Sequence, residues 1–297
     1  MSKNKIKESI GERAFDFCNV LFMILMIVIM LYPFWYVITC SVSDSNNLIG
    51  DKGLMLLPKG FSLSAYEAVL KNKNILTGYR NTIIIVVFGT AINIIMTSIG
   101  AFVLSRKKFA LKRAMSLMVI ITMYFNGGLI PTYLVVFKYL GLGDTLWALM
   151  LPTAINTYNL IVMKTNFESL PFSVEEAAKI DGASDIQLLF KIVMPLSMPI
   201  IAVMVLFYGV TQWNSWFNAL IYIRKPSLYP LQLRLREILL LNNTQNMAAG
   251  ADASDKYNIG EGIKYATIMV ATVPILCVYP FIQKYFVKGV MIGAVKG

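Results

Sequence analysis

Long apolar runs alternate with short charged segments along this chain of 297 residues. Six of the runs are long enough to cross a bilayer, for which about 20 apolar residues suffice. Each is expected to be helical, because backbone polar groups find no water to bond to inside hydrocarbon. The pattern therefore predicts an all-α membrane protein, in which residues 1–297 form a single transmembrane domain. The six predicted transmembrane helices cover approximately 17–40, 81–105, 114–137, 145–163, 192–208 and 265–283.

Composition agrees with this pattern, since 57% of the residues are hydrophobic and only 14% are charged. Such a balance is typical of a protein whose solvent is lipid. The first apolar run follows several basic residues, and no small-residue cleavage site ends it. We therefore interpret it as a retained helix and not as a signal peptide.

The distribution of Lys and Arg predicts the orientation. The segment "RKKFALKR" at 106–113 is strongly basic, and cytoplasmic loops retain Lys and Arg. If this segment lies inside, both termini and the loop 164–191 are cytoplasmic, whereas the longer segments 41–80 and 209–264 are extracellular. The net charge of +11 then reflects topology and attraction to anionic lipid, not nucleic-acid binding. The basic residues of the C-terminal tail agree with this orientation: Lys284, Lys288 and Lys296.

Several kinds of chemistry are missing from the sequence. There is no histidine, and the three cysteines are scattered at Cys18, Cys40 and Cys277, so neither a Ser/His/Asp triad nor a cysteine-based metal site is expected. No phosphate-binding G-x-x-x-x-G-K-[ST] loop is present. The predicted helices also lack the internal carboxylates that ion-driven transporters carry. We expect no catalytic residue, metal or bound cofactor, and any transport would take its energy from another protein.

The loop 164–191 is predicted to form two short helices joined by a turn. Ser173 and Glu176 have the spacing of a capping box, which places a helix start near Val174. Gly182 is suited to end this helix in a left-handed conformation. Ser184 and Gln187 repeat the capping-box spacing and open a second helix.

The first of these helices has features of a docking element. Ala177 and Ala178 leave its middle smooth, and charged residues surround them. A short helix with a small-residue face fits a groove in a partner protein; the alternative is an ordinary helical hairpin at the membrane surface. The surrounding charged residues are Glu175, Glu176, Lys179, Asp181 and Asp185.

The same stretch resembles a known family. Glu176-Ala177-Ala178, then Gly182, then Ile192 to Pro195 match the pattern E-A-A-x3-G-x9-I-x-L-P of binding-protein-dependent ABC importer permeases, with Met194 in place of Leu. Segments elsewhere resemble the carbohydrate-uptake branch, which is maltose-permease-like, and within it the oligosaccharide subgroup of the LplC and YtcP type. These segments are "YRNTIIIV", "NGGLIPTYLVV", "QWNSWFNALIYI" and "QKYFVKGVMIGAVKG".

The resemblance implies a type I importer permease fold and a place in the bacterial plasma membrane. It implies that this chain pairs with a second permease subunit as a heterodimer, with two cytoplasmic ATPase subunits that use ATP and Mg, and with an extracellular solute-binding protein that delivers an oligosaccharide. The EAA loop, about 164–195, then supplies the coupling helix that docks into the ATPase. The implied coupling residues are Glu175, Glu176, Ala177, Ala178, Asp181 and Gly182.

Candidate residues for a sugar pathway lie at the outer end of the fifth predicted span and within the third and fourth. Sugars are bound by aromatic rings together with side-chain amides and hydroxyls, and both occur in 208–218; the alternative is an interfacial aromatic belt. Amides in the third and fourth runs are further candidates, with interhelical hydrogen bonding as the alternative. Gly127, Gly128 and Pro131 are expected to break or bend the third run. The candidates are Tyr208, Gln212, Trp213, Asn214, Asn218, Asn126, Asn156 and Tyr158.

Other functions remain open at this stage. A permease of the same kind for a peptide or polyol is the nearest alternative. An enzyme acting on lipid-linked sugar needs carboxylates, for which Asp44, Asp51 and Asp144 are the candidates, and a passive channel needs no ATPase at all. The segment 228–243 is predicted to be an amphipathic helix, placed either against the binding protein or on the membrane surface. Whether this subunit or its partner permease holds most of the sugar contacts is also open.

Overall fold

The computed structural model describes residues 9–48, 53–107, 109–240, 260–278 and 280. Within these ranges the regular structure is helical, and a single isolated bridge pairs Ser43 with Phe61. This confirms the predicted all-α class. The chain divides into two compact units, one made of residues 1–71 and 242–270, the other of 72–241 and 271–297.

The first unit contains the long helix α1 (Ile10–Ser41), followed by α2 (Ser45–Leu48) and α3 (Ser64–Lys71). α1 starts at a capping box, in which Ser9 and Glu12 bond each other's backbone N–H. Its most apolar stretch is entirely exposed, which suits a helix whose solvent is lipid. The predicted first span therefore lies inside α1.

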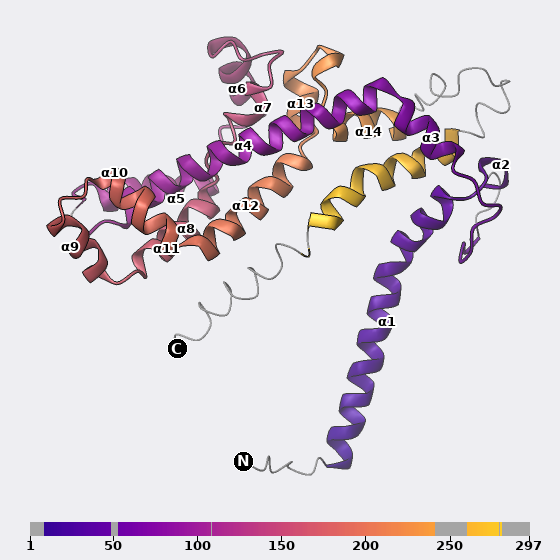
Figure 1. The fold of residues 1–297 in the computed structure, drawn as a ribbon, viewed down its shortest axis with the longest axis horizontal. Coiled ribbons are helices and arrows are strands. Elements are labelled where there is room, and N and C mark those ends of the chain that lie inside the picture. Colours follow the sequence, from indigo (N-terminus) through magenta and orange to yellow (C-terminus); the bar gives the residue numbers. More distant parts are fainter. Residues whose placement is uncertain (1–8, 49–52, 108, 241–259, 279, 281–297) are drawn as a thin grey trace. The chain divides into compact units, whose positions relative to one another are not determined.

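The second unit is built around α4 (Lys73–Ser105), a continuous helix of 33 residues. α8 (Thr157–Glu168) and α12 (Met198–Trp213) pack along it, and α14 (Leu231–Leu240) packs against its first turns. Figure 1 shows α9 and α10 at one end of α4 and α14 toward its other end. The remaining short elements there are α13 (Phe217–Tyr222) and the 3₁₀ turn η3 (Pro226–Leu228).

Two of the predicted spans are bent. α5 (Lys112–Tyr124) and the segment formed by α6 (Leu129–Tyr133) and η1 (Leu134–Tyr139) meet at 113°. The predicted break at the glycine pair is thereby confirmed, and Gly128 has a φ of +87° that favours glycine.

The second bend separates a short segment from α12. This segment consists of α10 (Asp185–Gln187), η2 (Leu188–Val193) and α11 (Met194–Leu196), and it meets α12 at 87°. Ser197 lies at the break and Pro199 follows in the first turn of α12, where its missing N–H is tolerated. The fifth predicted span, 192–208, therefore crosses this bend.

The prediction of a transmembrane helix over the fourth run, 145–163, needs correction. Here the structure has only the short α7 (Trp147–Met150), a break at 151–156, and then α8. Pro152 removes a backbone donor within the break, and the polar side chains around it bond neighbouring helices instead. Among the described residues, three helices are long and apolar enough to span a bilayer, or up to five if each bent pair is one span: α1, α4 and Gly260–Val278, with the two bent pairs.

Candidate functional site

The predicted docking helix is α9 (Phe172–Ile180). It starts earlier than predicted, because Pro171 occupies the N-cap position and favours a helix start directly after it. The predicted capping box of Ser173 and Glu176 is therefore wrong, since Ser173 lies within the first turn and no side chain caps the helix.

The end of α9 follows the prediction closely. Gly182 has a φ of +78°, and the N–H of Ala183 donates to the carbonyl of Ala178 at 2.9 Å across the turn. Ser184 and Gln187 form the predicted capping box, with each side chain bonded to the other's backbone. The helix–glycine–helix element is thus built from local sequence signals.

The two alanines of α9 differ in exposure. Ala178 is 5% exposed and belongs to an apolar cluster with Leu188 and Val193, whereas Ala177 is exposed. The turn itself is flanked by two apolar side chains that stand out from the surface, Ile180 at 85% and Ile186 at 72% exposure. An exposed surface with these features is typical of a protein-binding element.

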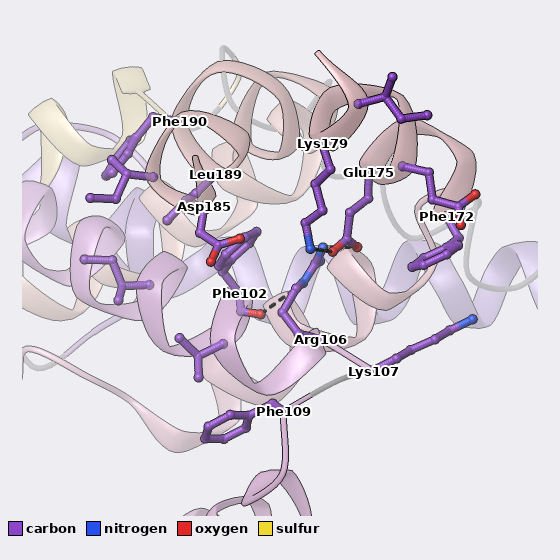
Figure 2. Close-up of a pocket in the computed structure, with 15 residues that line it drawn as sticks. Phe102, Arg106, Lys107, Phe109, Phe172, Glu175, Lys179, Asp185, Leu189 and Phe190 are labelled. Atoms are coloured by element: carbon purple, nitrogen blue, oxygen red, sulfur yellow. Dashed lines mark hydrogen bonds and ion pairs between the residues drawn. The ribbon is translucent and has the colours of Figure 1, made fainter. Parts of the chain in front are cut away.

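The two adjacent glutamates of α9 also differ. Glu176 is exposed, but the Glu175 carboxylate accepts from Arg106 Nη1 at 2.5 Å and from Lys179 Nζ at 3.0 Å. Figure 2 shows the three side chains pointing toward one another. Arg106 directly follows α4, so Glu175 faces this helix and not the exposed surface. The sequence carries no signal for this pair, because the two residues are 69 positions apart.

A cavity of about 1000 Å³ lies beside this pair, between the end of α4, α9 and the α10–η2 segment (Figure 2). Its apolar lining includes Phe102, Leu189 and Phe190, and its polar lining includes Glu176 and Asp185. The cavity is therefore lined by both apolar and charged side chains, next to the predicted docking helix.

Tyr208 and Gln212 lie in the interior of the second unit. Tyr208 is 3% exposed; its hydroxyl shares a hydrogen bond of 2.7 Å with Thr97 and accepts from the backbone N–H of Asn156 at 3.1 Å. Gln212 Nε2 donates to Thr153 Oγ1 at 3.2 Å. Tyr208 thus joins α12 to α4, and Gln212 joins α12 to the break between α7 and α8.

The break between α7 and α8 is held by these polar groups. Besides Gln212, Asn93 of α4 donates to the carbonyl of Thr153 at 3.0 Å, and Asn156 caps α8 by accepting from the N–H of Asn159 at 3.1 Å. Non-helical backbone at membrane depth requires such partners. We call Asn93, Thr97, Thr153, Tyr208 and Gln212 the polar hub.

The other candidate pathway residues lie apart from the polar hub. Trp213 donates to the carbonyl of Ala271 at 3.3 Å, while Asn214 donates to Val210 within its own helix. Asn126 accepts from the N–H of Gly128 at the α5–α6 break and is exposed, as is Tyr158 at the start of α8. Asn218 is half-buried in α13. Their role in binding sugar stays a prediction.

The predicted amphipathic segment 228–243 packs against α4 over its described part. Asn81 Nδ2 donates to the carbonyls of Ser227 and Tyr229, and the N–H of Leu231 donates to Thr82 Oγ1 at 2.8 Å. Gly78 allows the close approach, because a Cβ there would lie 3.2 Å from Leu231 Cα. α14 is therefore docked on the protein, and residues 241–243 lie outside the described residues.

The carboxylates considered for an enzyme have structural partners or are not described. Asp144 has a φ of 57° and accepts from the backbone N–H groups of Arg224 and Lys225, bonds that lower the pKa of its carboxyl. Asp44 accepts from the N–H of Asn46, and Asp51 lies outside the described residues. No group of three or more His, Cys, Asp or Glu side chains that could hold a metal occurs in the part of the chain that the structure describes.

Comparisons with known proteins agree on one family. Residues 93–292 match the family described as "Binding-protein-dependent transport system inner membrane component". The chain is 41% identical over 286 residues to the polygalacturonan/rhamnogalacturonan transport system permease protein YtcP of Bacillus subtilis, covering 96% of this chain and 99% of YtcP. It is 43% identical over 285 residues to LplC of Bacillus subtilis, covering 96% of each.

The fold is also similar to that of solved structures. One chain in the crystal structure of a bacterial ABC transporter involved in the import of the acidic polysaccharide alginate superposes with a TM-score of 0.88 at 33% identity, covering 95% of this chain and 100% of that one. A chain from the alginate transporter in complex with its pentasaccharide-bound periplasmic protein gives a TM-score of 0.50 at 15% identity, covering 91% of this chain and 95% of that one, and supports the fold alone.

Proposed function

We propose, from the premise that this chain belongs to the family of binding-protein-dependent transport system inner membrane components, that it is the permease subunit of an ABC importer for an oligosaccharide. The chain is a multi-pass membrane protein of this family. The observation that carries the proposal is the exposed helix–glycine–helix element at the end of α4, which carries the EAA sequence. In this proposal the element docks into a separate ATPase, since the sequence contains no G-x-x-x-x-G-K-[ST] phosphate-binding loop.

The exposed side of α9 supplies the contact to the ATPase in this proposal. Glu176, Ala177 and Asp181 are exposed, and the Gly182 turn carries apolar side chains on both sides. A groove in an ATPase subunit would cover these apolar side chains and pair with the carboxylates. ATP and Mg would be bound by the ATPase, and conformational change there would move α9.

The assembly is proposed to contain a second permease subunit, two ATPase subunits and an extracellular binding protein. In this arrangement α9 and both termini are cytoplasmic, in line with the basic segment 106–113 beside α9. Substrate would pass between the two permeases by alternating access. The polar hub offers hydroxyl and amide groups for this pathway if the helices separate in another state.

An acidic oligosaccharide is the substrate class that we favour. Relatives are named for polygalacturonan/rhamnogalacturonan transport and for import of the acidic polysaccharide alginate. The end of the second unit away from α9 carries guanidinium groups over aromatic rings, with Arg224 over Phe137 at 4.9 Å and Arg236 over Trp216 at 4.7 Å. Arginine beside an aromatic ring suits a sugar that bears a carboxylate.

The test is reconstitution of the chain in lipid with candidate permease and ATPase partners. We expect ATPase activity to rise when a binding protein loaded with an acidic oligosaccharide is added, together with uptake of that sugar. A binding protein loaded with a neutral oligosaccharide of equal length is the control. If ATPase activity rises only with a binding protein loaded with a peptide or a polyol, the proposed substrate class is wrong. If the chain associates with no ATPase, the proposal that it belongs to an ABC importer is refuted.

A further inference from the structure

The ion pair between Arg106 and Glu175 lies within the permease chain, on the side of α9 that faces α4. The inference drawn from this pair rests on the proposed function. Glu175 and Glu176 are neighbours in sequence, yet only Glu176 is exposed; the Glu175 side chain is 16% exposed and the Arg106 side chain 17%. A carboxylate buried to this degree against α4 is poorly placed to contact another protein. Its partner is on the permease itself.

Arg106 is held rigidly at the end of α4. Its guanidinium lies over the Phe102 ring at 4.4 Å, its Nε donates to the Phe102 carbonyl, and its Nη2 donates to Ser105 Oγ at 2.9 Å. All of these contacts belong to the last turn of α4 or its cap. We therefore expect the guanidinium to move together with the end of α4. The side chains of a fully exposed ion pair, in contrast, sample many conformations.

α4 carries displacement from this end to the polar hub. It is one uninterrupted helix from Lys73 to Ser105, and Thr97 lies about 12 Å from Ser105 along the axis at about 1.5 Å per residue. Thr97 bonds Tyr208, and Asn93 bonds the broken α7–α8 segment. A shift of the α4 end thus acts directly on the hydrogen bonds that hold α12 and the break.

The covalent route from α9 leads elsewhere. After Gly182 the chain continues through α10, η2 and α11 and then turns by 87° into α12. That route reaches α12 through a turn and a bend and does not include α4. Besides the apolar packing around Ala178, the Lys107 ammonium lies over the Phe172 ring of α9 at 4.8 Å. Among the described residues, the ion pair that joins α9 to the end of α4 is the Glu175 carboxylate on Arg106.

We propose that the Arg106–Glu175 ion pair transmits movement of α9 to α4, so that both are positioning residues for transport and not contacts to the ATPase. When the ATPase displaces α9, Glu175 moves the guanidinium and with it the end of α4. Loss of the pair would leave docking and ATP hydrolysis in place while α4 follows α9 less closely. The expected defect is therefore uncoupling.

The experiment uses the complete reconstituted importer and measures complex assembly, ATP hydrolysis and sugar uptake for each variant. Glu175→Gln and Arg106→Met each remove one charge. We expect both to assemble and hydrolyse ATP, with sugar imported per ATP reduced on the order of tenfold, a typical size for loss of one coupling contact. Unchanged sugar per ATP in both variants would overturn the proposal.

A matched control is present at the same end of the unit. Lys112 Nζ bonds Glu168 Oε1 at 2.7 Å and joins the start of α5 to the end of α8. The two side chains are 31% and 33% exposed, so this ion pair is also partly buried. It does not involve α9. Lys112→Met and Glu168→Gln are expected to keep sugar per ATP at the wild-type value; an equal loss in these variants would show a general stability effect and refute the specific role.

Rescue tests the pair directly. Because Lys179 also bonds Glu175, the exchange of charges is made in a Lys179→Gln background, so that an arginine at 175 is not repelled. Lys179→Gln with Arg106→Glu and Glu175→Arg is expected to recover sugar per ATP relative to Lys179→Gln with Glu175→Arg alone. No recovery, with assembly intact, would contradict the proposal.

Failure of the proposed function is distinguishable from failure of this inference. If wild-type chain assembles with no ATPase, the importer assignment fails before any variant is compared. If the wild type couples hydrolysis to uptake and the Glu175→Gln variant does so equally well, only the role of the ion pair fails.

Discussion

The end and the middle of α4 are held in place by different chemistry. At its end, charged groups pair across elements, with Arg106 on Glu175. In its middle, the neutral side chains Asn93 and Thr97 bond Thr153 and Tyr208. A charge at membrane depth is costly, whereas neutral amides and hydroxyls satisfy one another there. The same helix is thus held at its end by an ion pair and in its middle by neutral hydrogen bonds.

The two regions are expected to respond differently to mutation. Ion pairs at the α9 end lie beside the surface that we propose docks into the ATPase, so their loss is expected to change coupling between proteins. The polar hub is buried and joins three elements of one unit, so its loss is expected to change stability first.

The largest effect is expected at the turn after α9. Gly182→Leu places a side chain at a φ of +78°, in the middle of the docking surface. We expect uptake to be abolished while the protein still inserts, because the ATPase groove no longer accepts the turn. Uptake by reconstituted vesicles and membrane content by immunoblot measure the two properties.

Gly141→Leu is the matched control for this variant. Gly141 has a φ of +64° and, like Gly182, open space around its missing Cβ, so the backbone strain is similar but the docking surface is untouched. It should keep most uptake. Equal loss of uptake in both variants would mean that strain, and not docking, explains the Gly182 result.

A smaller effect, on stability, is expected in the polar hub. Tyr208→Phe removes the hydroxyl that bonds Thr97 and the backbone N–H of Asn156, and it leaves the buried Thr97 hydroxyl with one partner fewer. We expect a loss of about 1 kcal/mol in the free energy of unfolding, seen as a lower Tm in lipid nanodiscs. Sugar imported per ATP should stay nearer to wild type than in Glu175→Gln; a pure coupling defect with unchanged Tm would reverse the comparison.

The smallest effect is expected from a charge that belongs to neither region. Hydrogen bonds from backbone N–H groups lower the pKa of the Asp144 carboxyl in the folded protein. The stabilisation is therefore fully present above the ordinary Asp pKa, which is about 3.9, and is lost as the pH falls through the lowered value. Tm measured from pH 7 into acid should fall less steeply for Asp144→Asn than for wild type. Identical curves would remove Asp144 as an acid-sensitive contact.

The docking element was predictable in most of its parts. Gly182 and the Ser184–Gln187 capping box are local signals that the structure confirms. The start of α9 was missed, because Pro171 competes with Ser173 for the same boundary and a proline at the N-cap overrides the capping-box spacing. The direction of Glu175 was missed for another reason: helical spacing alone does not tell which neighbour a carboxylate will meet.

Only part of the polar hub could be predicted. Tyr208 and Gln212 were predicted as candidate residues of a sugar pathway, whereas Asn93, Thr97 and Thr153 carried no local signal. The break at 151–156 was missed because the apolar content over 145–163 is high enough for a transmembrane helix. Pro152 can end a helix there only if other side chains bond the backbone groups that lose their helical partners, and the sequence does not show those side chains.

Features that depend on neighbouring residues could be predicted without coordinates: the positions of the apolar runs, the glycine breaks, the turn at Gly182 and membership in a permease family. Pairs between distant segments became known from the folded chain, such as Arg106 with Glu175, 69 positions apart, and Thr97 with Tyr208, 111 positions apart. The physical reason is that propensity and burial act along a helix, whereas a hydrogen bond or ion pair forms only where packing brings two specific atoms within about 3 Å.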